Sequence, residues 1–232
     1  MTAARRRRFR PFRTLARLAG LLILASILWV GVYRFVPVPA SFIMLRDTVN
    51  GISVRRNWVS LSEISPSLPR AVIGAEDAKF CVHDGFDFEA IEDALEESEA
   101  SGRLRGASTI SQQTAKNAFL WPGRNLVRKG LEAYFTGLIE LLWGKTRIME
   151  VYLNVAEFGP GIYGADAAAI HHFNKHAADL TRGEAAHLAA VLPNPVERNA
   201  ASPGPYTTRY AARIERWIPI VDADGQDSCL NL

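Results

Sequence analysis

The sequence predicts a mainly α-helical protein preceded by one N-terminal transmembrane helix. Three observations lead to this prediction. Residues 18–33 form an uncharged, apolar run directly after a basic segment. From residue 67 onwards, apolar side chains recur at helical spacing between capping signals. Only residues 52–54 and 58–59 read as extended stretches. Because hydrophobic residues make up 48% of the chain, it can build a sizeable core.

The N-terminal segment divides into a basic tail, residues 1–17, and an apolar span, residues 18–36. The tail holds seven arginines and no acid, whereas Arg34 alone lies at the far end of the span. This asymmetry places the N-terminus in the cytoplasm. A cleaved signal peptide is the alternative, but no clean small-x-small cleavage site precedes residues 37–39. We therefore expect a retained anchor, and either reading exports the rest of the chain.

Charge and cysteine content exclude two classes of protein. Without the arginines of the tail, 20 basic residues face 24 acidic ones, so the body does not read as a nucleic-acid-binding surface. Cys81 and Cys229 allow one disulfide at most and no disulfide framework. We expect Cys81 to have a packing or incidental role rather than a nucleophilic one.

The body reads as one helical domain. Residues 37–66 form a membrane-proximal segment, residues 67–220 the domain, and residues 221–232 a polar C-terminal tail. Capping signals predict helices that begin at Ser67, after Ser108 and after Thr146. Periodicity and capping together predict helices over Phe88–Ser98, 125–143, Ile162–Phe173, Ala185–Leu192 and Tyr206–Ile218.

Glu76 is the first residue with chemical potential. Ile73, Glu76 and Phe80 are spaced to share one helical face, so the carboxyl group has apolar neighbours. Desolvation there would raise its pKa, as a general base requires. His83 falls on the same face if the helix continues. The alternative is an ordinary capping or pairing role for Glu76.

Residues 108–117 form a helix of almost wholly uncharged hydrogen-bonding side chains. Thr109, Gln113 and Lys116 share one face at helical spacing. Such a face contributes little hydrophobic burial but suits a polyhydroxylated or anionic ligand. A solvated surface helix is the alternative, although it would more often carry Glu and Lys.

A third polar group contains Arg124, Arg128, Lys129 and Glu132. An ion pair between Arg128 and Glu132, one helical turn apart, is the simplest interpretation. The functional interpretation is that the cations receive a pyrophosphate beside Glu132. Between this group and the polar helix, residues 119–122 read either as a core plug or as a lip at the membrane interface.

These blocks resemble the motifs of glycosyltransferase family 51, the peptidoglycan glycosyltransferases. The resemblance rests on Glu76-Asp77 with Phe80, His83 and Gly85; on Gly106–Asn117; on Arg128-Lys129-x-x-Glu132; on Lys145, Ile148, Glu150, Tyr152-Leu153-Asn154 and 158–164; and on 184–188 with 192–195. It covers half of the chain, and its second motif is the most specific. Cys81 departs from the family, which often has an aromatic residue there.

The resemblance implies a lysozyme-like helical lobe beside a smaller membrane-proximal lobe. It implies polymerisation of lipid II into glycan strands by inverting transfer, with release of undecaprenyl pyrophosphate. Glu76 would be the general base, and Glu132 the second catalytic carboxylate. The substrate-binding residues would be Asp77, Phe80, His83, Ser108, Thr109, Gln112, Gln113, Lys116, Asn117, Arg124, Arg128 and Lys129. Because no transpeptidase motif set is present, no crosslinking activity is expected.

The resemblance also implies partners and a location. Lipid II, the lipid-linked nascent glycan and the bilayer are the expected partners, and nucleic acid is not one. Contacts with other cell-wall synthesis proteins stay open. No tightly bound cofactor is expected, and a Mg²⁺ or Mn²⁺ requirement stays open. The expected location is the bacterial cytoplasmic membrane, with the catalytic domain on its outer side.

Two other functions are compatible with parts of this pattern. A lytic transglycosylase would cleave the same glycan with one acid and no pyrophosphate-binding cations. A catalytically inert membrane scaffold would be expected to lack a motif carboxylate, whereas Glu76 and Glu132 are both present.

Overall fold

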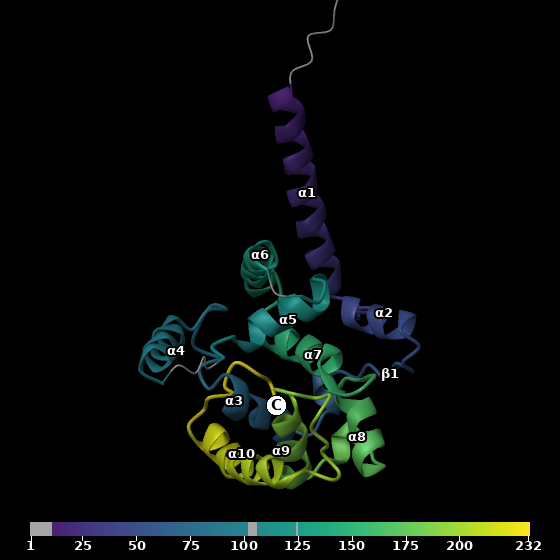
Figure 1. Cartoon of the computed structure of the whole chain (residues 1–232), viewed down its shortest axis with the longest axis vertical. Coiled ribbons are helices and arrows are strands. Elements are labelled where there is room, and N and C mark those ends of the chain that lie inside the picture. Colours follow the sequence, from purple (N-terminus) through teal and green to yellow (C-terminus); the bar gives the residue numbers. More distant parts are fainter. Residues whose placement is uncertain (1–10, 102–105, 124) are drawn as a thin grey trace, which may run out of the picture.

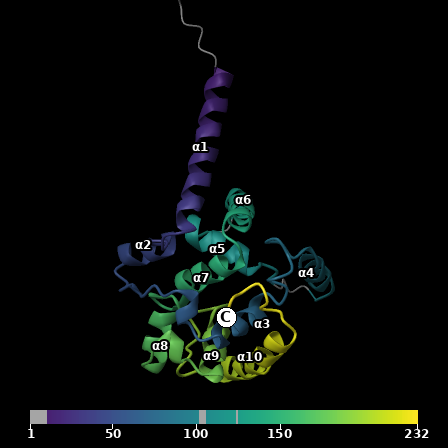
Figure 2. The same cartoon turned by 180° about the vertical axis from the view of Figure 1, so that it is seen from behind.

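The computed structural model describes residues 11–101, 106–123 and 125–232, and it is mainly helical, as predicted. One long helix, α1, stands away from a body of shorter helices (Figures 1 and 2). The α-helices are α1 Pro11–Tyr33, α2 Phe42–Val49, α3 Ser67–Glu76, α4 Phe88–Ser101, α5 Ile110–Phe119, α6 Leu126–Leu142, α7 Lys145–Val155, α8 Ala165–Phe173, α9 Arg182–Val191 and α10 Pro205–Ala223. The short elements are β1 Arg55–Arg56, β2 Glu157–Gly159, β3 Ile162–Tyr163 and the 3₁₀ turns η1 Leu61–Glu63 and η2 Ala177–Asp179.

Helix α1 is long and apolar enough to cross a membrane over residues 12–33. Its C-terminal end packs against the body. Val30 is fully buried, and its carbonyl oxygen accepts a hydrogen bond from the Trp143 indole nitrogen at 2.8 Å. The Trp29 ring meets the Phe119 ring edge-on, with centroids 5.2 Å apart. These contacts make the end of α1 part of the folded core, which favours a retained anchor over a cleaved signal peptide.

The body has two groups of helices. Helices α3, α9 and α10 pack on one another farthest from α1, and α5 packs against both α6 and α7 nearer to it (Figure 1). The nearer group contains an aromatic cluster in which Phe119 stacks on Phe135 at 4.8 Å between ring centroids. Phe119 and Leu120 therefore form a core plug, while Trp121 beside them is partly exposed. The carboxyl end of α3 and α5 meet between the two groups, where Gln113 of α5 donates a hydrogen bond to Glu76.

A small three-stranded sheet ties the membrane-proximal segment to the body. Strand β3 is central, parallel to β1 and antiparallel to β2. Gly161, in the turn between β2 and β3, has a φ of 74°, and a Cβ atom there would lie 2.5 Å from the Ser53 carbonyl oxygen. Only glycine fits this approach without strain.

Several local predictions are wrong by a few residues. Thr109, not Ser108, caps α5, because its hydroxyl accepts from the Gln112 amide while the Gln112 side chain accepts from the Thr109 amide. Gly144, rather than Thr146, precedes α7. The predicted helix over residues 162–173 begins only at Ala165, because residues 162 and 163 form β3. Helix α2 was not predicted.

The helix carrying Glu76 ends at that residue, so His83 does not extend its face as a helical neighbour. The chain instead forms a loop over residues 77–87 before α4. Cys81 in this loop forms a disulfide with Cys229. The cysteine content allowed one disulfide at most, and this is that pair. The prediction of an incidental role for Cys81 is therefore wrong.

Candidate active site

Glu76 lies at the carboxyl end of α3, partly buried. Its Oε2 atom accepts a hydrogen bond from the Gln113 side-chain amide at 2.9 Å. Burial raises the pKa of Glu76, and the Gln113 hydrogen bond and the Lys116 and Arg198 charges oppose that rise. The raised pKa predicted from the sequence is therefore confirmed. The carboxyl group lines a cavity of about 240 Å³ with Asp77, Lys79, Ser108 and Thr109 among its walls.

Helix α5 directly follows residues 106–109, which line this first cavity. Its capping box fixes the start of the helix, so that Gln113, Lys116 and Asn117 line a second cavity of about 170 Å³. Gln113 contacts both cavities. Its side-chain amide donates a hydrogen bond to Glu76, which lines the first cavity, and Gln113 itself lines the second. Gln112 is buried and its carbonyl oxygen caps the helix, so the structure gives it a supporting role rather than a place in the groove.

Glu132 lies on α6 and is only 3% exposed. Its two oxygens are held by neighbouring cations, Oε2 by Arg128 at 2.8 Å and Oε1 by Lys129 at 2.5 Å. Arg128 is itself buried, and its Nε has no hydrogen-bond partner among the described residues. A buried guanidinium with a spare donor favours a bound anion. Arg124, the fourth predicted cation, lies outside the described residues.

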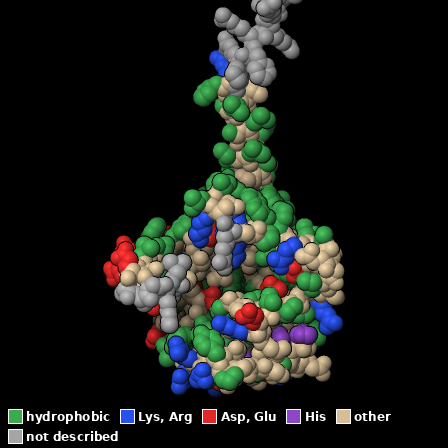
Figure 3. Space-filling model, viewed as in Figure 1, with side chains coloured by type: hydrophobic (Ala, Val, Ile, Leu, Met, Phe, Trp, Pro, Cys, Tyr) green, Lys and Arg blue, Asp and Glu red, His purple; other side chains and the backbone are tan. Residues whose placement is uncertain are grey.

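Lys116 links the two carboxylates electrostatically. Burial lowers the pKa of Lys116, as do the charges of Arg128 and Lys129, whereas Glu132 and Glu76 both raise it. One ammonium group is thus within electrostatic reach of Glu76 on one side and Glu132 on the other. Figure 3 shows the corresponding face hollowed between the upper and lower helices, with acidic and basic side chains at its edges. The first cavity is lined by Glu76 but not by Glu132, so the meeting of the two carboxylates around one cleft stays a prediction.

Asp77, Phe80 and His83 lie in the loop that follows Glu76. Asp77 Oδ1 pairs with His83 Nε2 at 2.9 Å, and Asp77 Oδ2 accepts from the Ile110 amide at the start of α5 at 2.9 Å. Phe80 is fully buried, below the Lys145 ammonium group at 4.7 Å. Phe80 and His83 therefore hold the loop in place, and only Asp77 of the three also lines the first cavity.

Three residues near the site were not among the predicted site residues. The Arg198 charge acts on Glu76, and its guanidinium is held by the Ala190 carbonyl oxygen at 2.8 Å. Tyr152 is fully buried beside Gln113, and Glu157 lines the second cavity. Tyr152 belongs to the motif Tyr152-Leu153-Asn154 noted in the sequence, so its place near the site could have been predicted. Arg198 and Glu157 stand among loop and short-strand residues whose position depends on the tertiary fold.

Among the described residues, no group of three or more His, Cys, Asp or Glu side chains is placed to hold a metal ion. Glu132 has both oxygens engaged by cations. Lys116, Arg128 and Lys129 are cations of the site whose charges can neutralise an anionic substrate.

The fold and the site define a membrane-anchored, helical protein with a partly buried carboxyl group, Glu76, lining a cavity and a cluster of cations around the buried Glu132. Comparison with known proteins agrees with this class. A family model described as transglycosylase matches residues 45–218. A biosynthetic peptidoglycan transglycosylase of Caulobacter vibrioides is 50% identical over 209 residues, which cover 90% of this chain and 91% of that protein.

Two further relatives carry the same description. One from Rhodospirillum centenum is 53% identical over 219 residues, covering 94% of each chain. One from Bacteroides thetaiotaomicron is 49% identical over 221 residues, covering 91% of this chain and 89% of the relative. The chain belongs to the transglycosylase family, and it is a glycosyltransferase.

Proposed function

We propose that this protein polymerises lipid II into peptidoglycan glycan strands and releases undecaprenyl pyrophosphate. The single observation that carries the proposal is that Lys116 interacts electrostatically with two groups of residues. One is Glu76, whose pKa is raised by burial, and the other is the cluster of Arg128, Lys129 and Glu132. Polymerisation of peptidoglycan agrees with the family match and with the description of the relatives. The lipid-linked donor follows from the charge of the patch, since a neutral glycan would not need it.

Glu76 is the general base in this proposal. It accepts the proton from the 4-hydroxyl of the acceptor GlcNAc as that oxygen forms a bond to the anomeric carbon of the donor MurNAc. The bond from that carbon to the pyrophosphate oxygen breaks, and the oxygen leaves with the electron pair. Attack and departure on opposite faces of the sugar invert the configuration from α to β. The hydrogen bond from Gln113 orients the carboxylate for this step.

The cations assist the leaving group. Pyrophosphate departs as an anion, so it needs charge neutralisation more than protonation. Lys116 and Arg128 face this charge, and Lys129 completes the patch on α6. Glu132 holds Arg128 and Lys129 in place through both of its oxygens, which is a catalytic contribution by positioning of charge. Arg124 joins the patch in the proposal on the strength of the sequence alone.

The membrane placement supports a lipid-linked substrate. Besides α1, the outer face of α6 presents Leu126 and Leu141, 91% and 79% exposed, on the side of the body from which α1 emerges (Figure 1). We propose that this face meets the outer surface of the cytoplasmic membrane, with the basic N-terminal tail in the cytoplasm. Anchoring the enzyme where the polyprenyl tail resides raises the effective concentration of each for the other.

Incubation of the full-length protein with lipid II in liposomes tests the proposal. The expected products are glycan strands longer than one disaccharide unit together with undecaprenyl pyrophosphate in matching amount. A parallel incubation uses finished, lipid-free glycan. Shortening of that glycan without strand growth from lipid II would identify a lytic enzyme and contradict the proposal. Absence of both reactions would leave a scaffold role and contradict it equally.

A further inference from the structure

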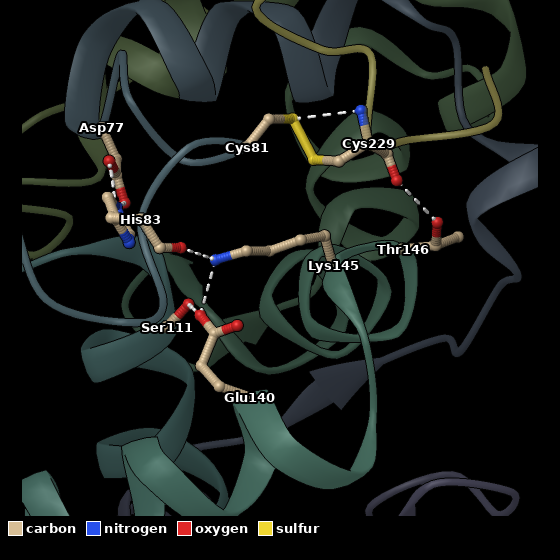
Figure 4. The surroundings of a disulfide bond; sticks show 8 residues. All are labelled: Asp77, Cys81, His83, Ser111, Glu140, Lys145, Thr146 and Cys229. Atoms are coloured by element: carbon tan, nitrogen blue, oxygen red, sulfur yellow. Dashed lines mark hydrogen bonds and ion pairs between the residues drawn. A yellow bond between two sulfur atoms is a disulfide. The ribbon is translucent and has the colours of Figure 1, made fainter.

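The Cys81–Cys229 disulfide joins two segments that are 148 residues apart in the sequence. Cys81 lies in the loop that begins at Asp77, directly after the proposed base. Cys229 lies in the segment that follows α10, and its amide donates to Cys81 Sγ at 3.3 Å. Figure 4 shows the disulfide close to the hydrogen-bonded groups that support this loop.

The inner side of the loop is fastened to the site by a chain of polar contacts. The Lys145 ammonium group donates to the His83 carbonyl oxygen and to Glu140, both at 2.6 Å. Glu140 also accepts from the Ser111 hydroxyl at 2.5 Å, which brings α5 into the same network (Figure 4). At the end of the loop, the Thr109 hydroxyl donates to the Gly85 carbonyl oxygen at 2.7 Å.

The outer side of the loop is held differently. Val82 and the neighbouring Lys79 and Asp84 are exposed, and the loop has no regular secondary structure. The disulfide therefore supplies the covalent attachment of the loop on this side. Besides the disulfide, this side has the exposed ion pair between Lys79 and Glu89 of α4, which is worth little because water screens it.

The C-terminal segment is itself firmly placed, so it can act as an attachment point. The Cys229 carbonyl oxygen accepts from the Thr146 hydroxyl at 3.2 Å, and Leu230 is buried. Arg70 on α3 binds Asp227 at 2.7 Å and Asp222 at 2.6 Å. The segment thus contacts both α3, from which the loop starts, and α7.

We propose that residues 224–232 act as a strap whose disulfide positions the loop over residues 77–85, and through it Glu76 and the start of α5, for glycosyl transfer. Cys81 and Cys229 are positioning residues in this proposal, which rests on the proposed function. Arg128 and Lys129 on α6 are held by Glu132 rather than by the loop. Opening the disulfide should therefore lower kcat while leaving the binding of the pyrophosphate-linked substrate nearly unchanged, because misplacing a reacting group costs rate more than affinity.

The test compares the oxidised full-length protein with the C81S/C229S variant and with the wild type after treatment with dithiothreitol. Lipid II polymerisation gives kcat and KM, and hydrogen exchange reports on the amides of residues 77–85 and 109–112. We expect kcat to fall on the order of tenfold, KM to change less than about twofold, and exchange in both segments to increase. Dithiothreitol should have no effect on C81S/C229S.

A matched control separates positioning from general stabilisation. Arg70→Ala removes the ion pair that holds Asp227 of the same C-terminal segment and the one that holds Asp222 of α10, but it leaves the disulfide in place. It should lower the melting temperature while kcat stays within about twofold of the wild type. If kcat falls equally in Arg70→Ala and in C81S/C229S, the strap is only a stabilising element and the proposal is overturned.

Other outcomes are equally decisive. Unchanged kcat in C81S/C229S would overturn the proposal, and so would a fall in kcat without faster exchange in residues 77–85. If C81S/C229S does not fold by circular dichroism, the reduced wild type, folded before treatment, gives the same comparison. If the oxidised wild type does not polymerise lipid II at all, the proposed function fails, while the exchange data still decide whether the disulfide holds the loop.

Discussion

The two carboxylates of the cleft have opposite surroundings. Glu76 is partly exposed at the end of α3, and a neutral amide is the donor that the structure gives its side chain. Glu132 is buried on α6 and bonded to two cations. Burial raises the pKa of the first, which suits proton uptake, whereas the second is engaged in holding positive charge. In the proposed mechanism, one residue type thus serves proton transfer in one group of helices and charge placement in the other.

Replacing Glu76 by Gln should give the largest effect. The amide cannot take up the acceptor proton, so polymerisation should fall by about 10³-fold or more. Folding should be retained. Because burial raises the folded-state pKa of Glu76, the folded protein is favoured when this carboxyl is protonated and loses that advantage as pH rises through the pKa. At neutral pH the Gln variant should therefore melt no lower than the wild type. Activity within tenfold of the wild type would remove Glu76 as the base.

Replacing Arg128 by Ala should give the next largest effect. Glu132 would lose one of its two cationic partners, and the cleft would lose a guanidinium with a spare donor. Polymerisation should fall by about 10²-fold, with weaker binding of lipid II. Arg216→Ala, an exposed arginine of α10, is the control and should change neither quantity. Equal lipid II affinity in Arg128→Ala and wild type would contradict the pyrophosphate role.

The pH dependence should distinguish the two carboxylates. The rate should fall on the acidic side with a midpoint above 4.5, the ordinary value for Glu, because burial raises the Glu76 pKa. Gln113 donates the hydrogen bond that lowers this pKa. In Gln113→Ala the acidic limb should therefore move to still higher pH. A limb that stays in place or moves to lower pH would show that Gln113 does not act on the titrating group.

Two matching helix caps allow the smallest and most specific comparison. Thr109 and Thr181 both form capping boxes, on α5 in the site and on α9 away from it. Each Thr→Ala change should cost about 1 kcal/mol of unfolding free energy, measured by urea denaturation. Only Thr109→Ala should also lower polymerisation, because Thr109 additionally donates to the Gly85 carbonyl oxygen. Equal activity in the two variants would mean that this contact does not support the site.

Much of the fold could be predicted because its signals are local. The apolar span, the Thr181–Glu184 capping box and the helix over residues 126–142 all appear in the structure near their predicted positions. The raised pKa of Glu76 followed from three residues at helical spacing. Thr109 was placed on the ligand face, but it caps the helix, because Ser and Thr in succession give the same local signal.

What could not be predicted depends on contacts between distant segments. The Cys81–Cys229 pair, the ion pairs of Arg70 and the approach of Arg198 to Glu76 all cross the fold. The family resemblance implied that Phe80 contacts substrate, and spacing placed it on the helical face of Glu76. It is buried instead, because the helix ends at Glu76 and the chain turns inward.

The pH–rate profile of a Glu132→Gln variant tests the division of labour between the carboxylates most directly. This substitution removes the negative charge that holds Arg128 and Lys129, so the rate should drop at every pH. The acidic limb should persist, because Glu76 still titrates. A Glu132→Gln variant whose rate no longer depends on pH in the acidic range would show that Glu132, and not Glu76, is the base.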